Sequence, residues 1–193
     1  MLDRDCRDRV VKDLREAPQQ VHAGLTVIRD VVLEYAAACL QAGASGVFLA
    51  SQMANYDALT REEYQEFGVA YDLPILESLQ GKSRLTMLHA CRQNVMFELV
   101  AGYPVDVINW ADRAVTGPTL AQARQMSGKA LAGGLAVETL FNGTADDVRR
   151  EVRDAVVQTG GRGFMLTPGC TINARSPAAN LHAARQALAE GLS

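Results

Sequence analysis

Hydrophobic residues form short continuous runs that alternate with longer segments in which apolar positions recur every three or four residues. An apolar run of roughly four to eight residues between turn residues is typical of a buried strand, and the wider spacing is typical of an amphipathic helix. Strands separated by helices in this way indicate a parallel sheet joined by right-handed crossovers. The expected strands lie at residues 46–51, 85–89, 106–110, 130–134 and 163–167.

The N-terminal segment 7–41 is expected to be helical, because Val27, Val31 and Tyr35 recur at helical spacing. Pro18 predicts a break within it, since proline lacks the N–H that a helix interior requires. Further along the chain, Thr and Glu residues three positions apart predict a capped helix that runs from residue 60 to about residue 79. The remaining helices are expected at 95–101, at 120–126, at 147–159 after Thr144, and from Pro177 onward.

The length of the chain limits the fold that this pattern can form. A complete eight-stranded β/α barrel usually takes about 250 residues and rarely fewer than about 200, whereas this chain has 193. We therefore expect one α/β domain over residues 1–193, with an N-terminal helical segment at 7–42. It would be a partial (β/α)8 TIM-type barrel of about five parallel β/α units. Such a sheet leaves two exposed edges, so we expect a homodimer or a partner chain that completes the barrel.

Composition and charge exclude several classes of protein. The chain is 48% hydrophobic and 21% charged, as is ordinary for a soluble globular protein, and its net charge of -3 argues against nucleic-acid binding. No apolar run approaches the roughly 18 residues that span a bilayer, and the charged N-terminus does not resemble a secretory signal. We expect a cytoplasmic protein whose partners include neither nucleic acid nor membrane.

Cysteine and histidine residues at the ends of two expected strands provide the candidate metal site. The four cysteines have no disulfide-framework spacing, and Cys39 is interpreted as a small core residue. His89 and Cys91 are two positions apart, so in a strand they would point the same way, and Cys170 follows the last strand. One imidazole and two thiolates suit Zn²⁺ and leave a fourth position open for chemistry. A histidine beside a buried cysteine is also a common packing feature, and Cys170 at a second strand end is what favours metal binding.

Polar residues follow the same strand ends, where parallel β/α folds gather their chemistry. Arg92, Arg113 and Arg175 could together bind an anionic substrate, or they could be solvated loop residues. Asp112 could orient His89 or hold an arginine. The candidate catalytic residues are Asp112 and Tyr56, and the candidate substrate-binding residues are Gln52, Arg92, Asn109, Trp110, Arg113 and Arg175.

Five motifs occur in an order that resembles the uroporphyrinogen decarboxylase superfamily, which also contains the methylcobamide:thiol methyltransferases. The resemblance covers nearly the whole chain but only the C-terminal part of that family's barrel. The motifs are residues 43–48, residues 88–91, residues 105–110, residues 142–148, and residues 167–170 followed by 176–181.

This resemblance implies a zinc site and a reaction. His-x-Cys after one strand and Cys after the last form the zinc set of the methyltransferase branch, and His89, Cys91 and Cys170 match it. In that branch zinc binds the acceptor thiol and lowers its pKa, and the thiolate takes a methyl group from a corrinoid. The resemblance thus implies an enzyme with Zn²⁺, a small-molecule thiol substrate and a corrinoid protein as partner.

The chain also departs from the family pattern. Residues 133–136 read Gly-Gly-Leu-Ala where the family usually has Gly-Asn-x-Asp, so two polar groups are missing. The N-terminal arginines and the aspartate that serve decarboxylation belong to the part of the family fold that is absent. Two alternatives stay open: a decarboxylase-like lyase acting on a porphyrinogen or another polycarboxylate, and a half-barrel subunit without catalytic activity.

Overall fold

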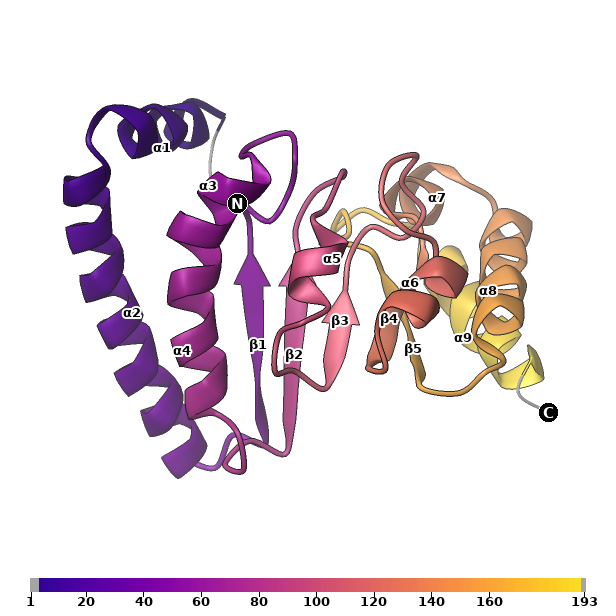
Figure 1. Cartoon of the computed structure of the whole chain (residues 1–193). Coiled ribbons are helices and arrows are strands. Elements are labelled where there is room, and N and C mark those ends of the chain that lie inside the picture. Colours follow the sequence, from indigo (N-terminus) through magenta and orange to yellow (C-terminus); the bar gives the residue numbers. More distant parts are fainter. Residues whose placement is uncertain (1–3, 192–193) are drawn as a thin grey trace.

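A parallel sheet of five strands forms the centre of the molecule in the computed structural model, which describes residues 4–191 (Figure 1). Each strand pairs with the next along the chain, so the spatial order equals the sequence order and β1 and β5 form the two edges. All five predicted strands are present. They are β1 (Gly46–Ser51), β2 (Leu85–Ala90), β3 (Val107–Asn109), β4 (Ala130–Leu135) and β5 (Phe164–Pro168).

Helices flank the sheet on two sides, with α2 and α4 beside β1 and with α8 and α9 packed together beyond β4 and β5 (Figure 1). The longer helices are α1 (Arg4–Glu16), α2 (Pro18–Gln41), α4 (Ala70–Ser78), α8 (Ala145–Thr159) and α9 (Ala178–Gly191). The shorter elements are α3 (Arg61–Tyr64), the π-helical turn η1 (Gln65–Val69), α5 (Phe97–Val100), α6 (Leu120–Met126) and α7 (Val137–Asn142).

The two faces of the sheet differ sharply in burial. Successive strand residues point to opposite faces, and Leu88, Ile108 and Leu131 point to the face that the helices cover, where each is 0% exposed. On the other face Phe48 is 57% exposed and Met165 is 41% exposed. We call this second surface the open face and define it by Phe48, Met87, His89, Asn109, Met165 and Thr167, which the strand register aligns across the sheet.

The N-terminal helices show the predicted break, because α1 ends at Glu16 and Pro18 is the first residue of α2. The apolar stripe of α2 faces outward, with Val27 63% exposed and Tyr35 71% exposed. Cys39, predicted to be a core residue, is only half-buried. Helix α2 therefore contributes little to the core beyond its contact with α4.

The helix predicted over 60–79 is divided into α3, η1 and α4. The predicted capping box is present, since the Thr60 hydroxyl accepts from the Glu63 N–H at 3.2 Å and the Glu63 carboxylate accepts from the Thr60 N–H at 2.9 Å. The π-helical turn follows because the Tyr64 ring packs against Gly68, where a Cβ would lie 2.2 Å from it. Sequence periodicity does not report such a bulge.

Two other helix predictions need correction. The last helix begins at Ala178, after Pro177, rather than at the proline itself. Helix α7 was not predicted, because its six residues are too few to display a helical period. Within the described part of the chain, no helix has the length and apolar character that crossing a membrane requires.

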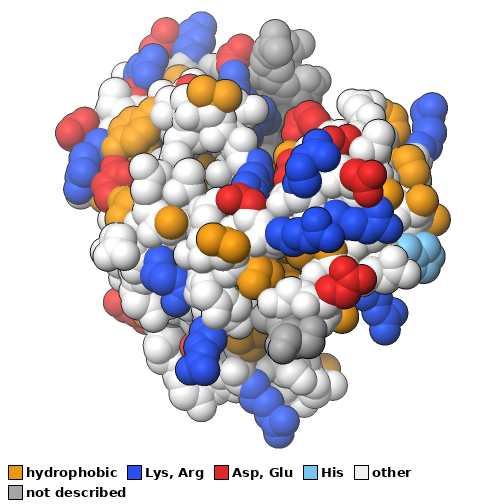
Figure 2. All heavy atoms as spheres, turned by 90° about the vertical axis from the view of Figure 1, so that its right-hand side faces the viewer, with side chains coloured by type: hydrophobic (Ala, Val, Ile, Leu, Met, Phe, Trp, Pro, Cys, Tyr) orange, Lys and Arg blue, Asp and Glu red, His pale blue; other side chains and the backbone are white. Residues whose placement is uncertain are grey.

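The outer surface of α8 and α9 is an ordinary solvated face. Figure 2 shows basic and acidic side chains interspersed there with small apolar areas. Along α8 the charges pair locally, as where Arg149 lies 2.8 Å from Asp146 and Arg150 contacts Asp147. Exposed pairs of this kind add little to stability, and because opposite charges alternate along α8, this face offers no concentrated charge for a partner.

Candidate functional site

His89 lies near the end of β2 on the open face. Its residue is 6% exposed, and its ring stacks on Phe48 with 6.0 Å between centroids and 17° between planes. Burial lowers the pKa of His89, an effect that neighbouring Asn109 opposes. Nδ1 is buried and has no hydrogen-bond partner among the described residues. Burial thus favours the neutral form of the imidazole, which is the form that binds metals.

Cys170 reaches the same place from β5 through a tight passage of the backbone. A Cβ at Gly169 would lie 2.7 Å from the Ala111 Cα and 3.0 Å from the Trp110 carbonyl oxygen, so only glycine fits. The Gly169 N–H donates to the Leu135 carbonyl oxygen at 3.0 Å and fixes the turn to β4. This passage brings the Cys170 Sγ to 3.5 Å from the His89 Nε2.

Cys91 follows β2 and is held by the neighbouring strand. Its N–H donates to the Ser51 carbonyl oxygen at 2.9 Å, which extends the β1–β2 ladder by one residue. Burial, and after it the nearby Cys170 thiol, raise the pKa of the Cys91 thiol to about 11, while Arg92 acts in the opposite direction. The Cys170 sulfur therefore lies close enough to Cys91 to influence the ionisation of the Cys91 thiol.

The spacing of two of these groups fits zinc. Bonds of about 2.1 Å to nitrogen and about 2.3 Å to sulfur in a tetrahedral site separate the two ligand atoms by about 3.6 Å. The observed separation of the His89 Nε2 and the Cys170 Sγ is 3.5 Å. Across residues 4–191, however, no three His, Cys, Asp or Glu side chains already form a complete metal site. A three-ligand site therefore requires Cys91 to move relative to the other two.

Two cavities meet at Cys170. One, of about 270 Å³, lies on the open face and includes His89, Asn109 and Cys170. The other, of about 380 Å³, lies beyond the strand ends and is lined on one side by Leu135 and Cys170. A group bound at Cys170 would therefore be reachable from two directions.

Asp112, predicted to be catalytic, is buried beneath β4. Its side chain is 1% exposed, and its Oδ1 accepts from the Gly134 N–H at 2.9 Å. The other oxygen has no hydrogen bond among the described residues and lies 3.6 Å from the Arg113 Nε. Burial raises the pKa of Asp112. Among the described residues, neither a hydrogen bond nor an ion pair joins Asp112 to His89, so the catalytic role of Asp112 stays a prediction.

The three predicted arginines lie in different surroundings. Arg113 donates to the Gly134 carbonyl oxygen at 3.1 Å and to the Glu151 carbonyl oxygen at 2.8 Å, and it also pairs with Asp154. Its guanidinium is thus used within the protein. Arg92 lines the same cavity as Cys170 and has a left-handed backbone φ of 73°. Arg175 lies in the loop before α9 and lines neither cavity at Cys170.

The other predicted binding residues have mainly internal contacts. Trp110 is 0% exposed, packs on Phe97 and donates to the Pro118 carbonyl oxygen at 2.9 Å, so it belongs to the core. The Asn109 amide donates to the Ala132 carbonyl oxygen and the Thr167 hydroxyl, each at 3.0 Å, and ties three strands together under the site. The Gln52 carbonyl oxygen accepts from the Asn55 amide at 3.0 Å.

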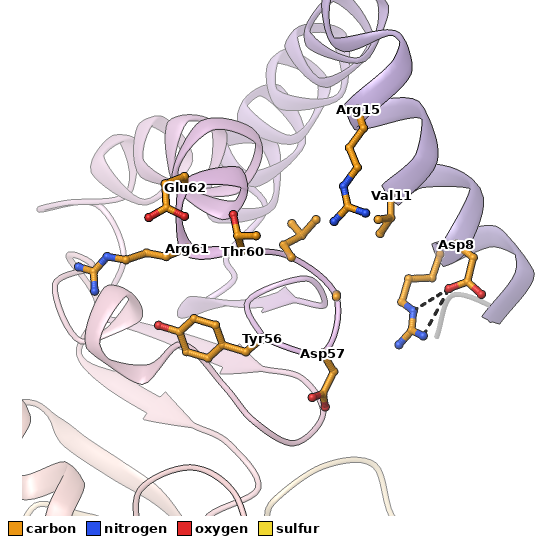
Figure 3. Close-up of a pocket in the computed structure, with 11 residues that line it drawn as sticks. Asp8, Val11, Arg15, Tyr56, Asp57, Thr60, Arg61 and Glu62 are labelled. Atoms are coloured by element: carbon orange, nitrogen blue, oxygen red, sulfur yellow. Dashed lines mark hydrogen bonds and ion pairs between the residues drawn. The ribbon is translucent and has the colours of Figure 1, made fainter.

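Tyr56, the second predicted catalytic residue, lies in a separate hollow. Figure 3 shows it there with Arg15 of α1 and Arg61 of α3. The hollow has a volume of about 720 Å³ and shares no lining residue with the two cavities at Cys170. The Tyr56 hydroxyl bonds to Glu98, which raises its pKa. The structure thus does not bring Tyr56 together with the zinc candidates.

Sequence reasoning missed a buried hydroxyl network behind the site. The Tyr64 hydroxyl bonds the Ser51 hydroxyl at 2.9 Å and donates to the Asp72 Oδ2 at 2.8 Å. The Tyr103 hydroxyl donates to the same oxygen at 3.1 Å. Ser51 also holds the Cys91 backbone, so this network supports a candidate ligand. Its members are far apart in the sequence and carry no motif.

Comparison with known proteins then places the chain in a family. A model described as uroporphyrinogen decarboxylase (URO-D) matches residues 5–191. The chain belongs to the URO-D family. Two curated relatives of this URO-D chain, from Methanosarcina mazei and Methanosarcina acetivorans, are both named methylcobamide:CoM methyltransferase MtbA. Each is 28% identical over 163 residues, which is 83% of this chain and 46% of the relative. The URO-D chain therefore spans about half the length of the curated relatives it matches.

A solved structure, described as a methyltransferase from Methanosarcina mazei, matches the URO-D chain with a TM-score of 0.82. The match covers 94% of this chain and 52% of that chain at 22% identity, so the likeness concerns the fold. The sequential parallel sheet is accordingly a partial barrel of TIM type. Both the family resemblance and the fold class predicted from the sequence are confirmed.

Proposed function

We propose that the chain carries out zinc-dependent methyl transfer from a corrinoid to a small thiol, with His89, Cys91 and Cys170 as the zinc ligands. The observation that carries this proposal is the 3.5 Å distance between the His89 Nε2 and the Cys170 Sγ. Cys91 is close to Cys170 and would complete the set. The names of the two curated relatives support the same reaction class.

The chemistry follows from the ligand set. Zinc held by His89, Cys91 and Cys170 would supply Lewis-acid chemistry that lowers the pKa of an acceptor thiol. In the overall reaction the thiol sulfur would gain the methyl group, the electron pair of the broken bond to that group would stay with the donor, and the thiol proton would pass to solvent. His89 serves as a neutral ligand, and burial favours that form.

The two cavities at Cys170 support a reaction between two bound molecules. Methyl transfer needs donor and acceptor to approach one point from different sides, and Cys170 lines both cavities. We assign the donor, presented by a corrinoid protein, to the open face, because that face is wide and uncovered. The thiol is assigned to the cavity of about 380 Å³ beyond the strand ends.

We further propose that a second polypeptide, or a second copy, covers the open face. The apolar side chains of Phe48 and Met165 are exposed there, and β1 and β5 are edge strands. Barrels of this type have eight strands. Light scattering coupled to size-exclusion chromatography, with and without candidate partner chains, measures the association.

Metal analysis of protein purified without chelators tests the zinc site. We expect about one zinc per chain by mass spectrometry, and loss of most of it in Cys170→Ser and in Cys91→Ser. Cys39→Ser, in α2 and outside both cavities, is the matched control and should retain its zinc. Zinc that is absent, or that is retained equally in all three variants, would contradict the proposal.

A second candidate function is decarboxylation of a polycarboxylate. Arg92 and Arg113 line the same cavity, and the family model is described as uroporphyrinogen decarboxylase. Binding of a tetrapyrrole carboxylate, weakened at least about tenfold by Arg92→Ala, Arg113→Ala or Arg175→Ala, would support it. If no binding is detected, or if none of the three substitutions weakens it, decarboxylation is removed as a candidate function. Methyl transfer and a non-catalytic subunit then remain.

A further inference from the structure

Helix α2 has an apolar side that faces away from the rest of the described chain. Val27, Ile28 and Val31 are 63%, 58% and 60% exposed, and Tyr35 is 71% exposed. Figure 1 shows α2 as the outermost element on the left, beyond α4. We call the exposed residues 24, 27, 28, 31, 35 and 38 the outer stripe of α2. A contiguous apolar surface of this kind is typical of an interaction site.

The outer stripe lies opposite the side that holds α2 to the protein. On the inner side His22 stacks on Phe67 with 4.5 Å between ring centroids and bonds the Tyr71 hydroxyl at 2.7 Å. Val31 follows His22 by about two and a half turns, so the two side chains point in opposite directions. A helix that is apolar on two opposite sides is expected where both sides are covered.

Gly24 belongs to this stripe, although nothing in the described structure requires glycine at that position. Its φ is not positive, and a Cβ there would have no atom within 4 Å. Glycine in the interior of a helix is unfavourable relative to alanine. A bulky side chain from another molecule, packed against the bare backbone, accounts for a glycine here.

The spacing of the outer stripe suits a second copy of the same helix. Residues 24, 27, 31, 35 and 38 are separated by three, four, four and three positions, so the order is the same in both directions from Val31. A twofold axis at Val31 sets the two helices antiparallel, because each contact across such an axis is repeated in reverse. Val27 then meets the partner's Tyr35, and Gly24 meets the partner's Ala38.

This antiparallel arrangement matches a large residue with a small one. The Tyr35 hydroxyl interacts with Cys39 in the next turn, so the ring extends in that direction and lies level with the partner's Gly24. A parallel pair would instead set the two Tyr35 rings at one level and the two glycines at another. Close packing therefore favours the antiparallel pair.

The charge and the size of the surface also fit a pair of identical helices. Among the exposed residues of α2 only Asp30 and Glu34 are charged, and Asp30 pairs with Arg29 at 2.7 Å. The stripe itself is uncharged, so two copies can meet without burying an ion. A face of α2 is about 36 Å long and about 10 Å wide, so two such faces bury on the order of 1,000 Å². That area is near the lower limit for a specific interface.

We propose that two copies of the chain associate through the outer stripes of α2, packed antiparallel about a twofold axis at Val31. This surface shares no residue with the open face. The association does not depend on the proposed metal chemistry, because α2 lines neither cavity at Cys170.

Sedimentation equilibrium at concentrations up to about 200 µM tests the association, and we expect a dimer with a Kd of about 1–100 µM. Val31→Glu places two carboxylates against each other at the axis and should raise this Kd at least about tenfold. Val157→Glu is the matched control, because it makes the same change at a valine of α8 that is 80% exposed. It should leave the Kd unchanged.

Cysteine cross-linking tests the orientation in a protein whose Cys6 and Cys39 are replaced by serine. Val31→Cys should form a disulfide-linked dimer under mild oxidation, because the same residue of the other copy lies across the axis. Val27→Cys and Tyr35→Cys proteins should cross-link when they are mixed and much less when each is alone. Parallel packing predicts the reverse and would overturn the proposed arrangement.

Three other results would overturn the inference. The first is a protein that stays monomeric at about 200 µM. The second is a dimer that Val31→Glu leaves intact while Met165→Glu, a change on the open face, dissociates it. The third is a stripe that binds a different polypeptide but not its own copy.

Discussion

The Asp112 Oδ1 accepts a hydrogen bond from the Gly134 N–H at 2.9 Å, and this contact links the end of β3 to β4. The carboxylate occupies the space where a side chain at position 133 would begin, since a Cβ there would lie 2.5 Å from the same oxygen. Gly134 has a φ of 100° and could not carry a side chain without strain. Gly133 is thus required by the packing of Asp112, and Gly134, which stands where the family usually has asparagine, is favoured by its backbone conformation.

Gly133→Ala should therefore destabilise the protein. The added methyl group forces the buried carboxylate away from its donor, and overpacking of this kind costs about 1–3 kcal/mol. Urea unfolding followed by circular dichroism measures the change. Gly128→Ala is the matched control, because a Cβ at that position has no atom within 4 Å and its φ is not positive. Equal stabilities of the two variants would contradict the assigned role of Asp112.

Arg113→Lys should lower stability rather than ligand affinity. Lysine cannot reproduce the planar set of donors that reaches Gly134, Glu151 and Asp154 together. We expect a loss of about 1–3 kcal/mol in the free energy of unfolding. Arg153→Lys, on the exposed side of α8, should change it by less than about 0.5 kcal/mol. A stable Arg113→Lys protein with weakened binding would assign this arginine to a ligand after all.

Tyr64→Phe should destabilise the protein and loosen the backbone near Cys91. The substitution removes the hydroxyl that joins Ser51, Asp72 and Tyr103. A buried network that loses a central member should weaken folding by about 1–3 kcal/mol. Tyr35→Phe, in the exposed stripe of α2, is the control for the chemical change itself. Amide hydrogen exchange at Cys91, faster in Tyr64→Phe only, provides the local readout, and identical exchange in both proteins would argue against the coupling.

Asp72 gives the protein a predicted pH dependence. Burial raises its pKa above the ordinary value of 3.8, with the bonds from Tyr64 and Tyr103 acting in the opposite direction. The folded state therefore retains this proton at pH values where the unfolded state has lost it. The contribution of Asp72 is fully present below pH 3.8 and is lost as the pH rises through the raised folded value.

Asp72→Asn, which imitates the protonated form, tests this dependence. Relative to the parent protein, the variant should gain stability as the pH rises from about 4 to neutrality, because only the parent loses the contribution. Urea unfolding at several pH values measures the difference. A difference that does not change with pH would show that the carboxyl group ionises alike in the folded and unfolded states.

The strands could be predicted because their apolar runs are continuous. The residues on the covered face of the sheet are apolar because the helices pack on that face. Leu88, Ile108 and Leu131 must all be hydrophobic to pack beneath the helices. Helices α1 and α8 were found from proline and capping signals. The short α7 and the π-helical turn at 65–69 were missed, because a few residues cannot show a period and a bulge depends on what Tyr64 packs against.

The sequence predicted at which strand ends the candidate site residues lie, but it did not predict where all of their side chains point. The sequence placed polar residues after the strands, and His89 and Cys170 do approach each other there. Alternation along a strand turns neighbours to opposite faces, so Asn109 points to the open face while Trp110 enters the core. Tyr56 lies in a loop, where alternation gives no guidance, and the structure places it in another hollow.

The two outer strands of the sheet have a consequence for self-association. A twofold axis can place β1 of one copy beside β1 of another only with the strands running in opposite directions. Parallel pairing between copies must instead join β5 of one copy to β1 of the next. This pairing leaves an unpaired edge strand at each end of the assembly. Copies linked in this second way grow head to tail into a ring or a filament, and the twist of the sheet sets the rotation between successive copies.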